Sequence, residues 1–468
     1  MTRRSTAAVA LATCLLGGGA WANPFYVGRY RGLAGGPVDE SGWNVYWNPA
    51  GIAEPGARVA LSLQVVGRQG TYDKPAELNG IPPEEAAANA GFNETGALGL
   101  LPAMAGTWGW DLGDFVLGVG GAVFVARAGT ANWAKKPGGP AEFPGAYDGP
   151  QRWATINTFM AIVSTGVGLG VSHRPTGLSV GVTPVANFAT LSTVRARNLD
   201  TSEDLFQPDG RLKEGRILLE DATDMALTWI AGMRWDAADW FGLGLTWHAG
   251  HTYDLRGRAY IQAGDDPEQT VDAKVPLPVA HTVRGGLWVA PVEWLVLRPE
   301  FEWSNWSVMD EQTAVNNSPN DPGYGDALIP LARDFDDTWA TNLKLDVYDL
   351  VPHTVVHLGG GYETGATPTR THEPGLAEAD SFNLGLGFSV ALPYDVGLSV
   401  SYILHQFMDV TVTDSIQKPT TNGTYTDRRH YLTVDLEFAF GSDDDRAPSP
   451  FPRRDPGEVA AHDDAEGE

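Results

Sequence analysis

The chain is nearly free of cysteine, since Cys14 is the only one among its 468 residues. A disulfide framework and a zinc site built from thiolates each need several cysteines, so the sequence excludes both. The chain also has no uninterrupted apolar run of about 18 residues, the length that a membrane-spanning helix requires. The sequence is therefore neither that of a disulfide-stapled domain nor that of a helical membrane protein.

Basic residues are scarce relative to acidic ones. The chain holds 32 lysines and arginines against 58 aspartates and glutamates, which gives a formal net charge of -26. A surface of this sign repels nucleic acid, so no nucleic-acid partner is expected. The acidic excess instead indicates long, solvated surface loops.

The first 22 residues predict a secretory signal peptide. Arg3 and Arg4 form its charged start, Ala7 to Leu16 form its apolar segment, and Ala20-Trp21-Ala22 fits the small-residue cleavage rule. The alternative, a lipoprotein signal that uses Cys14, is disfavoured because Thr13 fits that pattern poorly. Cleavage after Ala22 would make Asn23 the first residue of a mature chain without cysteine.

Alternation of apolar and polar residues with period two is the dominant pattern of the chain. Its clearest instance is the segment 431–440, in which one face carries Leu432, Val434, Leu436, Phe438 and Phe440. Segments 241–248, 381–390 and 395–402 repeat the pattern. The mean hydropathy of -0.18 suits a transmembrane β-barrel, because only every second strand residue faces lipid.

About fourteen strands are predicted, most of them longer than the usual five or six residues of soluble strands. They cover residues 57–68, 103–111, 115–128, 153–173, 177–196, 217–236, 240–257, 270–291, 293–308, 336–350, 353–365, 379–392, 395–410 and 427–440. Short turns alternate with long polar connections at 69–102, 129–152, 197–216, 309–335 and 411–426, as in outer-membrane barrels. The predicted fold is all-β, a transmembrane antiparallel β-barrel.

The remaining segments complete the predicted domain organisation. Residues 23–56 are rich in glycine and proline and do not alternate, so we interpret them as an N-terminal hatch that plugs the lumen. Residues 57–440 form the barrel. Residues 441–468 are acidic and proline-containing, which predicts a disordered periplasmic tail.

Several motifs follow one another along the chain, namely Trp47-Asn48-Pro49-Ala50-Gly51 just before the first strand, Leu277-Pro278, Phe301 to Ser307, Ile329-Pro330, Asp337-Thr338-Trp339, Gly361-Tyr362-Glu363 and the final strand 431–440. In this order they resemble the motifs of the FadL-type outer-membrane transporters. The chain departs from the family at Asp39 to Trp43, where small residues are usual, and in its acidic tail.

The resemblance implies passive transport of hydrophobic compounds, with long-chain fatty acids as the expected ligand. Such a protein takes its ligand through an apolar groove between loops to an internal site, and a hatch shift opens the way out. By this analogy Asn48, Pro49 and Ala50 form the hatch turn and gate, and Asn23, Pro24 and Phe25 cap the inner site. The resemblance further implies an outer-membrane location, with membrane lipid, lipopolysaccharide and the barrel-assembly machinery as partners.

Strand parity yields an independent set of lumen residues. If Leu287, Leu297 and Phe301 face lipid, then Arg284 and Arg298 face inward, and Arg234 and Lys344 fall on the inward parity as well. An inward arginine or lysine can bind a carboxylate. Pairing of these charges with one another or with the hatch is the favoured alternative for any single residue.

Other functions have less support. A general porin needs an open lumen, which a plug would obstruct, and a structural or adhesive barrel differs only in lacking uptake. No nucleophile motif surrounds His248, His251 and Asp254, and the two histidines have opposite strand parity, so neither catalysis nor a metal or cofactor is predicted. A barrel of this size closes on itself, so a monomer is expected.

Overall fold

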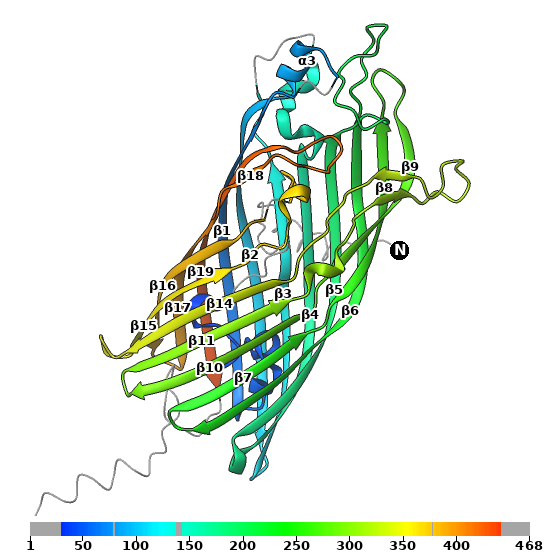
Figure 1. The fold of residues 1–468 in the computed structure, drawn as a ribbon. Coiled ribbons are helices and arrows are strands. Elements are labelled where there is room, and N and C mark those ends of the chain that lie inside the picture. The colour runs from blue at the N-terminus through cyan, green and yellow to red at the C-terminus, as the bar shows by residue number, and fades with distance from the viewer. Residues whose placement is uncertain (1–29, 78–79, 137–142, 377, 441–468) are drawn as a thin grey trace, which may run out of the picture.

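Nineteen strands join in one antiparallel sheet whose first and last members also pair, so the sheet closes into a barrel (Figure 1). This computed structural model describes residues 30–77, 80–136, 143–376 and 378–440. The predicted signal peptide, the predicted tail and the hatch residues Asn23, Pro24 and Phe25 lie outside the described residues.

The wall consists of fourteen strands, as predicted. Twelve are single elements: β1 (Gly56–Lys74), β2 (Gly91–Asp111), β3 (Phe115–Asn132), β4 (Asn157–His173), β5 (Leu178–Ala196), β6 (Arg216–Ala238), β11 (Leu295–Ser304), β14 (Thr338–Tyr348), β15 (Thr354–Glu363), β16 (Ser381–Leu392), β17 (Val396–Phe407) and β19 (Gly423–Phe440). Two are each divided by a bend, into β7 (Phe241–His248) with β8 (His251–Gln262), and β9 (Gln269–Val279) with β10 (Thr282–Val292).

The remaining elements lie in the hatch and the connections. The strands β12 (Ala314–Asn316), β13 (Ala327–Ile329) and β18 (Val410–Val412) are short. The α-helices are α2 (Asn44–Trp47) and α3 (Pro83–Ala88), and the 3-10 helices are η1 (Gly32–Ala34), η2 (Pro49–Ile52), η3 (Pro144–Asp148), η4 (Pro150–Trp153), η5 (Arg174–Thr176), η6 (Trp306–Val308) and η7 (Thr369–Thr371). No described helix is long and apolar enough to cross a membrane.

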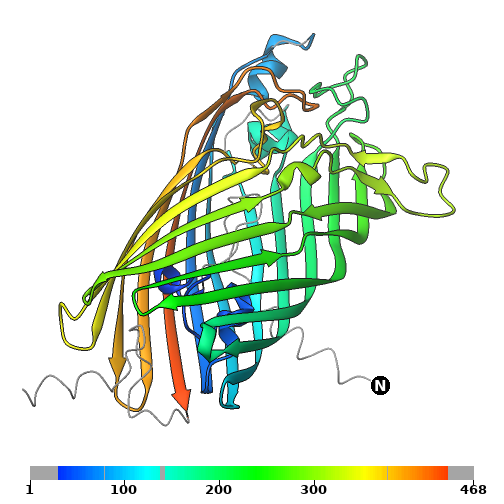
Figure 2. The same ribbon diagram turned by 60° about the horizontal axis from the view of Figure 1, so that its bottom comes forward.

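The barrel closes where its first strand pairs with its last. β1 pairs with β19 from Ala57–Phe440 to Asp73–Thr424, so the edge of the sheet is paired along almost the whole of both strands. Short turns lie at one end of the barrel, here called the turn end, and the long connections lie at the other, the loop end. The hatch lies inside the ring of strands near the turn end (Figure 2).

One predicted loop is shorter than expected because the strands on both sides of it continue beyond their predicted ends. β1 reaches Lys74 and β2 starts at Gly91, so the connection predicted over 69–102 spans only the residues between them, including α3. In the β1 extension the outward residues, such as Gln69 and Asp73, are polar and exposed, so that strand end lacks the apolar face on which the prediction depended. The β2 extension carries the exposed Phe92 and Leu98 beside the polar Glu94, so its alternation is only partly apolar.

The bend between β7 and β8 overturns the prediction that His248 and His251 face opposite sides. His248 contacts the ring of Tyr46 in the hatch, with 5.2 Å between centroids. His251 contacts Tyr253, whose side chain is fully buried inside the barrel. Strict parity fails because Gly250 breaks the strand, and a Cβ there would lie 2.6 Å from the carbonyl oxygen of Val279.

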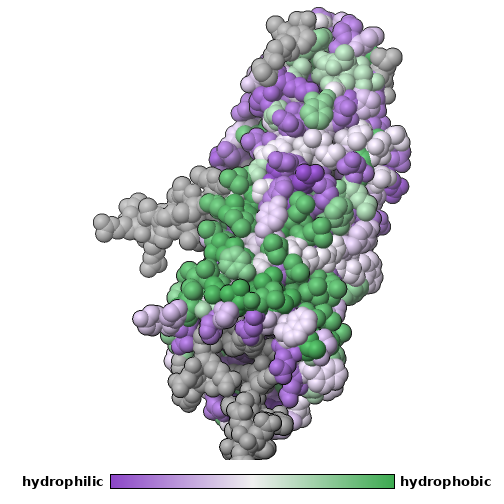
Figure 3. Space-filling model, turned by 90° about the vertical axis from the view of Figure 1, so that its left-hand side faces the viewer, coloured by the Kyte–Doolittle hydropathy of each residue, from purple (hydrophilic) through white to green (hydrophobic). Residues whose placement is uncertain are grey.

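The outer surface carries a belt of exposed apolar side chains around the turn-end half of the barrel (Figure 3). Leu169, Leu227 and Leu386 are each more than half exposed within it. Aromatic residues close to the turns include Trp108, Trp110, Trp240, Trp294 and Tyr394, all exposed. An apolar belt with aromatic rims is the surface that a bilayer requires of a barrel.

A charge placed on this belt tests the assignment of the lipid-facing side. Leu386→Arg, in the middle of β16, is expected to lower the free energy of unfolding from lipid vesicles by about 2–4 kcal/mol. Tyr394→Arg in the adjoining turn is the control and is expected to cost at most about 1 kcal/mol. Reversible denaturant titration measures both, and equal costs at the two positions would contradict the assignment.

Candidate functional site

The turn half of the lumen is filled by the hatch, which is anchored at Asn48. The Asn48 side-chain oxygen accepts a hydrogen bond from Ala50 N at 3.1 Å and so caps η2, which begins at Pro49. Its amide nitrogen donates to the carbonyl oxygens of Pro37, at 2.7 Å, and of Met233 on β6, at 3.0 Å. Asn48 therefore ties the hatch turn both to the rest of the hatch and to the wall.

Glycines in the wall allow this close approach. A Cβ at Gly232 on β6 would lie 2.0 Å from the Asn48 side-chain oxygen, and one at Gly181 on β5 would lie 2.2 Å from the carbonyl carbon of Pro49. Any larger residue at either position would displace the turn. The structure thus places Asn48, Pro49 and Ala50 where the hatch contacts β5 and β6, and their role in gating stays a prediction.

Of the four inward cations predicted from strand parity, Arg234, Arg284 and Lys344 are buried and Arg298 is half-buried, and all four contact the hatch. Arg234 pairs with Glu40 at 2.7 Å and with Glu54 at 3.5 Å. Arg298 pairs with Asp39 of the hatch, and with Asp346 of the wall at 2.8 Å.

The other two cations contact the hatch through its backbone and rings. Lys344 donates to Gly35 O at 2.6 Å and pairs with Glu300. Arg284 pairs with Glu302 and lies over the Trp47 ring at 5.4 Å. The inward orientation predicted for these residues is confirmed, and their binding of a ligand stays a prediction.

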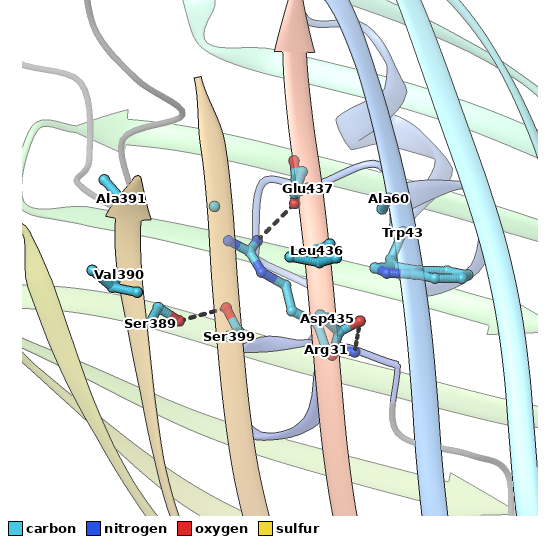
Figure 4. Close-up of a pocket in the computed structure, with 11 residues that line it drawn as sticks. Arg31, Trp43, Ala60, Ser389, Val390, Ala391, Ser399, Asp435, Leu436 and Glu437 are labelled. Carbon is cyan, nitrogen blue, oxygen red and sulfur yellow. Dashed lines mark hydrogen bonds and ion pairs between the residues drawn. The ribbon is translucent and has the colours of Figure 1, made fainter. Parts of the chain in front are cut away.

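On the opposite wall the hatch is held through Arg31 (Figure 4). Its backbone N–H donates to Asp435 on β19 at 3.2 Å, and its guanidinium lies 3.9 Å from Glu437. Arg58 on β1 pairs with the same Glu437 at 3.5 Å and with Glu54 of the hatch at 2.7 Å. Charged pairs therefore fasten the hatch to both sides of the barrel.

The wall is incomplete beside the hatch. β2 and β3 pair only from Asp111–Val116 to Met104–Val123, although β3 pairs with β4 as far as Asn132. A bulge lies between Val125 and Arg127. The Tyr30 hydroxyl of the hatch donates to Val125 O at 2.5 Å, so the hatch binds the backbone at the bulge.

Part of the loop half of the lumen is apolar. Inward side chains of β4, β5, β6, β8 and β9 form one buried cluster that includes Met160, Ile162, Leu191, Leu219, Leu255, Val275 and Leu277. Trp306, Met309 and Ile329 from the connection after β11, and Leu376 from the next, pack onto the same cluster. A water-filled porin carries polar side chains on this inner face, so the lumen is suited to an apolar ligand.

A cavity of about 80 Å³ lies within this apolar region. Its lining includes eight leucine, isoleucine, valine and methionine side chains, together with the charged residues Arg195, Arg333 and Glu373. Arg195 donates to Trp153 O at 2.8 Å, and no described carboxylate forms an ion pair with it. Arg333 pairs with Glu373 at 2.8 Å. Burial lowers the pKa of the neighbouring His372 to about 4, so its ring adds no charge at neutral pH.

Sequence reasoning missed both arginines of the cavity. Arg195 lies on the inward parity of β5, two residues beyond Thr193, so the alternation contained its signal. Arg333 lies in the connection between β13 and β14, where no periodicity applies. The described residues also contain no group of three His, Cys, Asp or Glu side chains that could hold a metal ion.

A second cavity, of about 560 Å³, opens between the hatch and the wall at the turn end. Its lining is charged and includes Arg31, Glu40, Glu54, Arg234 and Arg298. The cavity at the loop end and the cavity at the turn end thus differ in polarity, and the hatch separates them.

Comparisons with known proteins agree with this architecture. The sequence model described as "Outer membrane protein transport protein (OMPP1/FadL/TodX)" matches residues 162–440, which is more than half of the chain. No curated protein sequence matches the chain.

Solved structures share the fold at low sequence identity. A Pseudomonas aeruginosa FadL homologue has a TM-score of 0.71 at 14% identity, and the match covers 90% of this chain and 100% of that one. The Ralstonia pickettii toluene transporter TbuX has a TM-score of 0.61 at 13% identity over 88% and 99% of the chains. The Pseudomonas putida toluene transporter TodX has a TM-score of 0.59 at 12% identity over 90% and 99%. The chain belongs to the FadL/TodX family of outer-membrane transport barrels, which are channels for hydrophobic compounds and not enzymes.

Proposed function

We propose that the protein is a passive, hatch-gated transporter of long-chain fatty acids across the outer membrane. The observation that carries the proposal is the apolar loop half of the lumen, with two buried arginines at the edge of its cavity. The loop end is extracellular in this arrangement and the turn end periplasmic. Transfer of an apolar chain from water to such a surface is favourable by about 25 cal/mol per Å² of apolar surface buried.

The arginines at the cavity edge favour an acid over a neutral hydrocarbon. Arg195 has no ion-pair partner among the described residues, so its guanidinium can bind a carboxylate that enters from the loops. A charge-assisted hydrogen bond of this kind is roughly twice as strong as a neutral one. The fatty-acid head would therefore stay near Arg195 and Arg333 while its tail enters the apolar cluster.

The ligand can pass further inward only if part of the protein moves, because a cavity of about 80 Å³ holds only part of a long acyl chain. The hatch is the element placed to move, since its ties to the wall are individual ion pairs and hydrogen bonds. The unpaired stretch between β2 and β3, where Tyr30 binds Val125 O, is the exit that we favour. No energy source is needed, because the ligand moves down its gradient.

The alternative substrate is a neutral aromatic hydrocarbon. It is favoured by two of the similar structures, which are named as toluene transporters. The apolar cluster accepts either ligand, and only the arginines at the cavity edge distinguish them. A variant that removes one of these charges therefore separates the two substrates.

Uptake of labelled hexadecanoate by cells that contain or lack the protein tests the proposal directly. Arg195→Met is expected to raise the hexadecanoate concentration for half-maximal uptake about tenfold, while toluene uptake stays unchanged. Arg428→Met is the control, because Arg428 is exposed on the outward face of β19. Protein-dependent uptake of toluene without any uptake of hexadecanoate would contradict the fatty-acid assignment and make the aromatic hydrocarbon the substrate.

The role of the hatch is tested through Asn48→Ala. The variant loses three hydrogen bonds of the hatch turn, each contributing about 1 kcal/mol. Faster amide hydrogen exchange is expected over residues 44–52, with less hexadecanoate uptake at equal surface expression. Asn383→Ala, which removes one side-chain hydrogen bond to Asn342 within the wall, is the control. Unchanged exchange and uptake in Asn48→Ala would exclude this residue from gating.

A further inference from the structure

A half-buried cation without an ion-pair partner among the described residues lies on the turn-end side of the apolar cavity. The bulge of β3 brings Arg127 into register with Ile162, a member of the apolar cluster inside the barrel. Its guanidinium lies over the ring of Trp306, 5.2 Å from the centroid. Among the described residues no carboxylate forms an ion pair with Arg127, and the nearby Glu302 is already paired with Arg284.

Two further polar groups beside Arg127 have unused hydrogen-bonding atoms. The Tyr253 hydroxyl is buried and has no hydrogen-bond partner among the described residues, and the His251 ring is held only by the backbone of Ala249. The two rings are in contact, at 4.5 Å between centroids. The positive charge of Arg127 acts on both groups, and so does the negative charge of the Asp224 carboxylate. Arg127, Tyr253 and His251 are called the lower polar site below.

This site is arranged to donate hydrogen bonds. The guanidinium is a donor only, and the Tyr253 phenol can donate as well. Burying such groups without partners costs free energy, and an oxygen-bearing group from a ligand would satisfy them together. The methyl end of a fatty acid cannot supply one, because it has no polar atom.

The spacing between the lower polar site and the cavity edge matches one long acyl chain. On β4, Asn157 pairs with Val194, the residue before Arg195, and Ile162 pairs with Arg127. Those five residues span about 17 Å of strand. One acyl layer of a bilayer is half of its hydrocarbon core of about 30 Å. Between the two ends the lumen is lined by apolar side chains, among them Met160, Leu191 and Leu277.

We infer that the preferred ligands are long chains oxygenated at both ends, such as α,ω-dicarboxylates. One carboxylate binds at Arg195 and Arg333, the other binds the lower polar site, and the methylene chain lies along the apolar cluster between them. The inference rests on the proposed function, because it assigns the substrate class of the same lumen. It adds a second recognition point, which a simple fatty acid leaves unused.

Competition binding to the full-length protein in lipid nanodiscs tests the inference. Labelled hexadecanoate is displaced by unlabelled hexadecanoate or by hexadecanedioate. We expect hexadecanedioate to compete about tenfold more strongly, because of its second charge-assisted contact. Equal or weaker competition by hexadecanedioate would overturn the inference. Absence of any hexadecanoate binding would instead refute the proposed function, and the inference with it.

Two variants locate the second contact. Arg127→Met is expected to abolish the advantage of hexadecanedioate and leave hexadecanoate binding unchanged, and Tyr253→Phe, which removes one hydroxyl, is expected to reduce the advantage about threefold. Arg256→Met is the matched control, since Arg256 is exposed on the outer face of β8. Heat-modifiable mobility verifies that each barrel is folded. A full advantage in a folded Arg127→Met protein would refute the assignment of this site.

Discussion

The structure depends on one constraint, which is that no backbone hydrogen-bonding group can face lipid unpaired. The pairing of β1 with β19 satisfies it by removing the free edges of the sheet. Closure then assigns every second side chain to the lumen and the others to the belt outside. The interior of a fourteen-strand barrel is too wide for wall side chains alone to fill, so a further segment must occupy part of it. The hatch, the cavities and the internal charges all follow from that closed wall.

The charges inside the barrel are tolerable because the hatch supplies their partners. Arg234, Arg298 and Arg58 would each lose an ion-pair partner inside the barrel if Glu40, Asp39 and Glu54 were removed. Breaking one partner out of a buried ion pair costs several kcal/mol, so these pairs make a seated hatch much more stable than a displaced one. Asp39 and Glu40 lie in the segment where the sequence departs from the usual small residues of the family. The departure therefore has a structural counterpart, since both residues pair with wall arginines.

The sequence predicted the barrel well because a closed sheet in lipid imposes a strict period of two. Strand number, the inward side of Arg284 and Lys344, and the place of Asn48 in a turn before β1 all followed from that period or from the hatch motif. Prediction was wrong where the period breaks, as at Gly250, which turns both His248 and His251 into the lumen. It also missed Arg333, because a loop residue reaches the cavity through tertiary packing that no local pattern records. The contacts of the four inward cations with the hatch depend on the positions of Asp39, Glu40, Gly35 and Trp47, which only the folded structure supplies.

The two halves of the lumen have different roles, one in holding the hatch and the other in contacting the ligand. In the turn half, polar contacts join the wall to the hatch, and their removal alters how readily the hatch moves. In the loop half, apolar side chains with a few arginines face the ligand, and changes there alter which molecule binds. Tyr46 lies at the boundary, since its ring packs in the hatch while Arg284 and His248 of the wall approach it from the side. A ligand that reaches the lower polar site therefore meets residues adjacent to those that hold the hatch. Ligand binding at this site can weaken the attachment of the hatch to the wall only through contacts that differ between the seated and the displaced hatch. The cation–π contacts of Arg284 with Tyr46 and Trp47 are contacts of this kind.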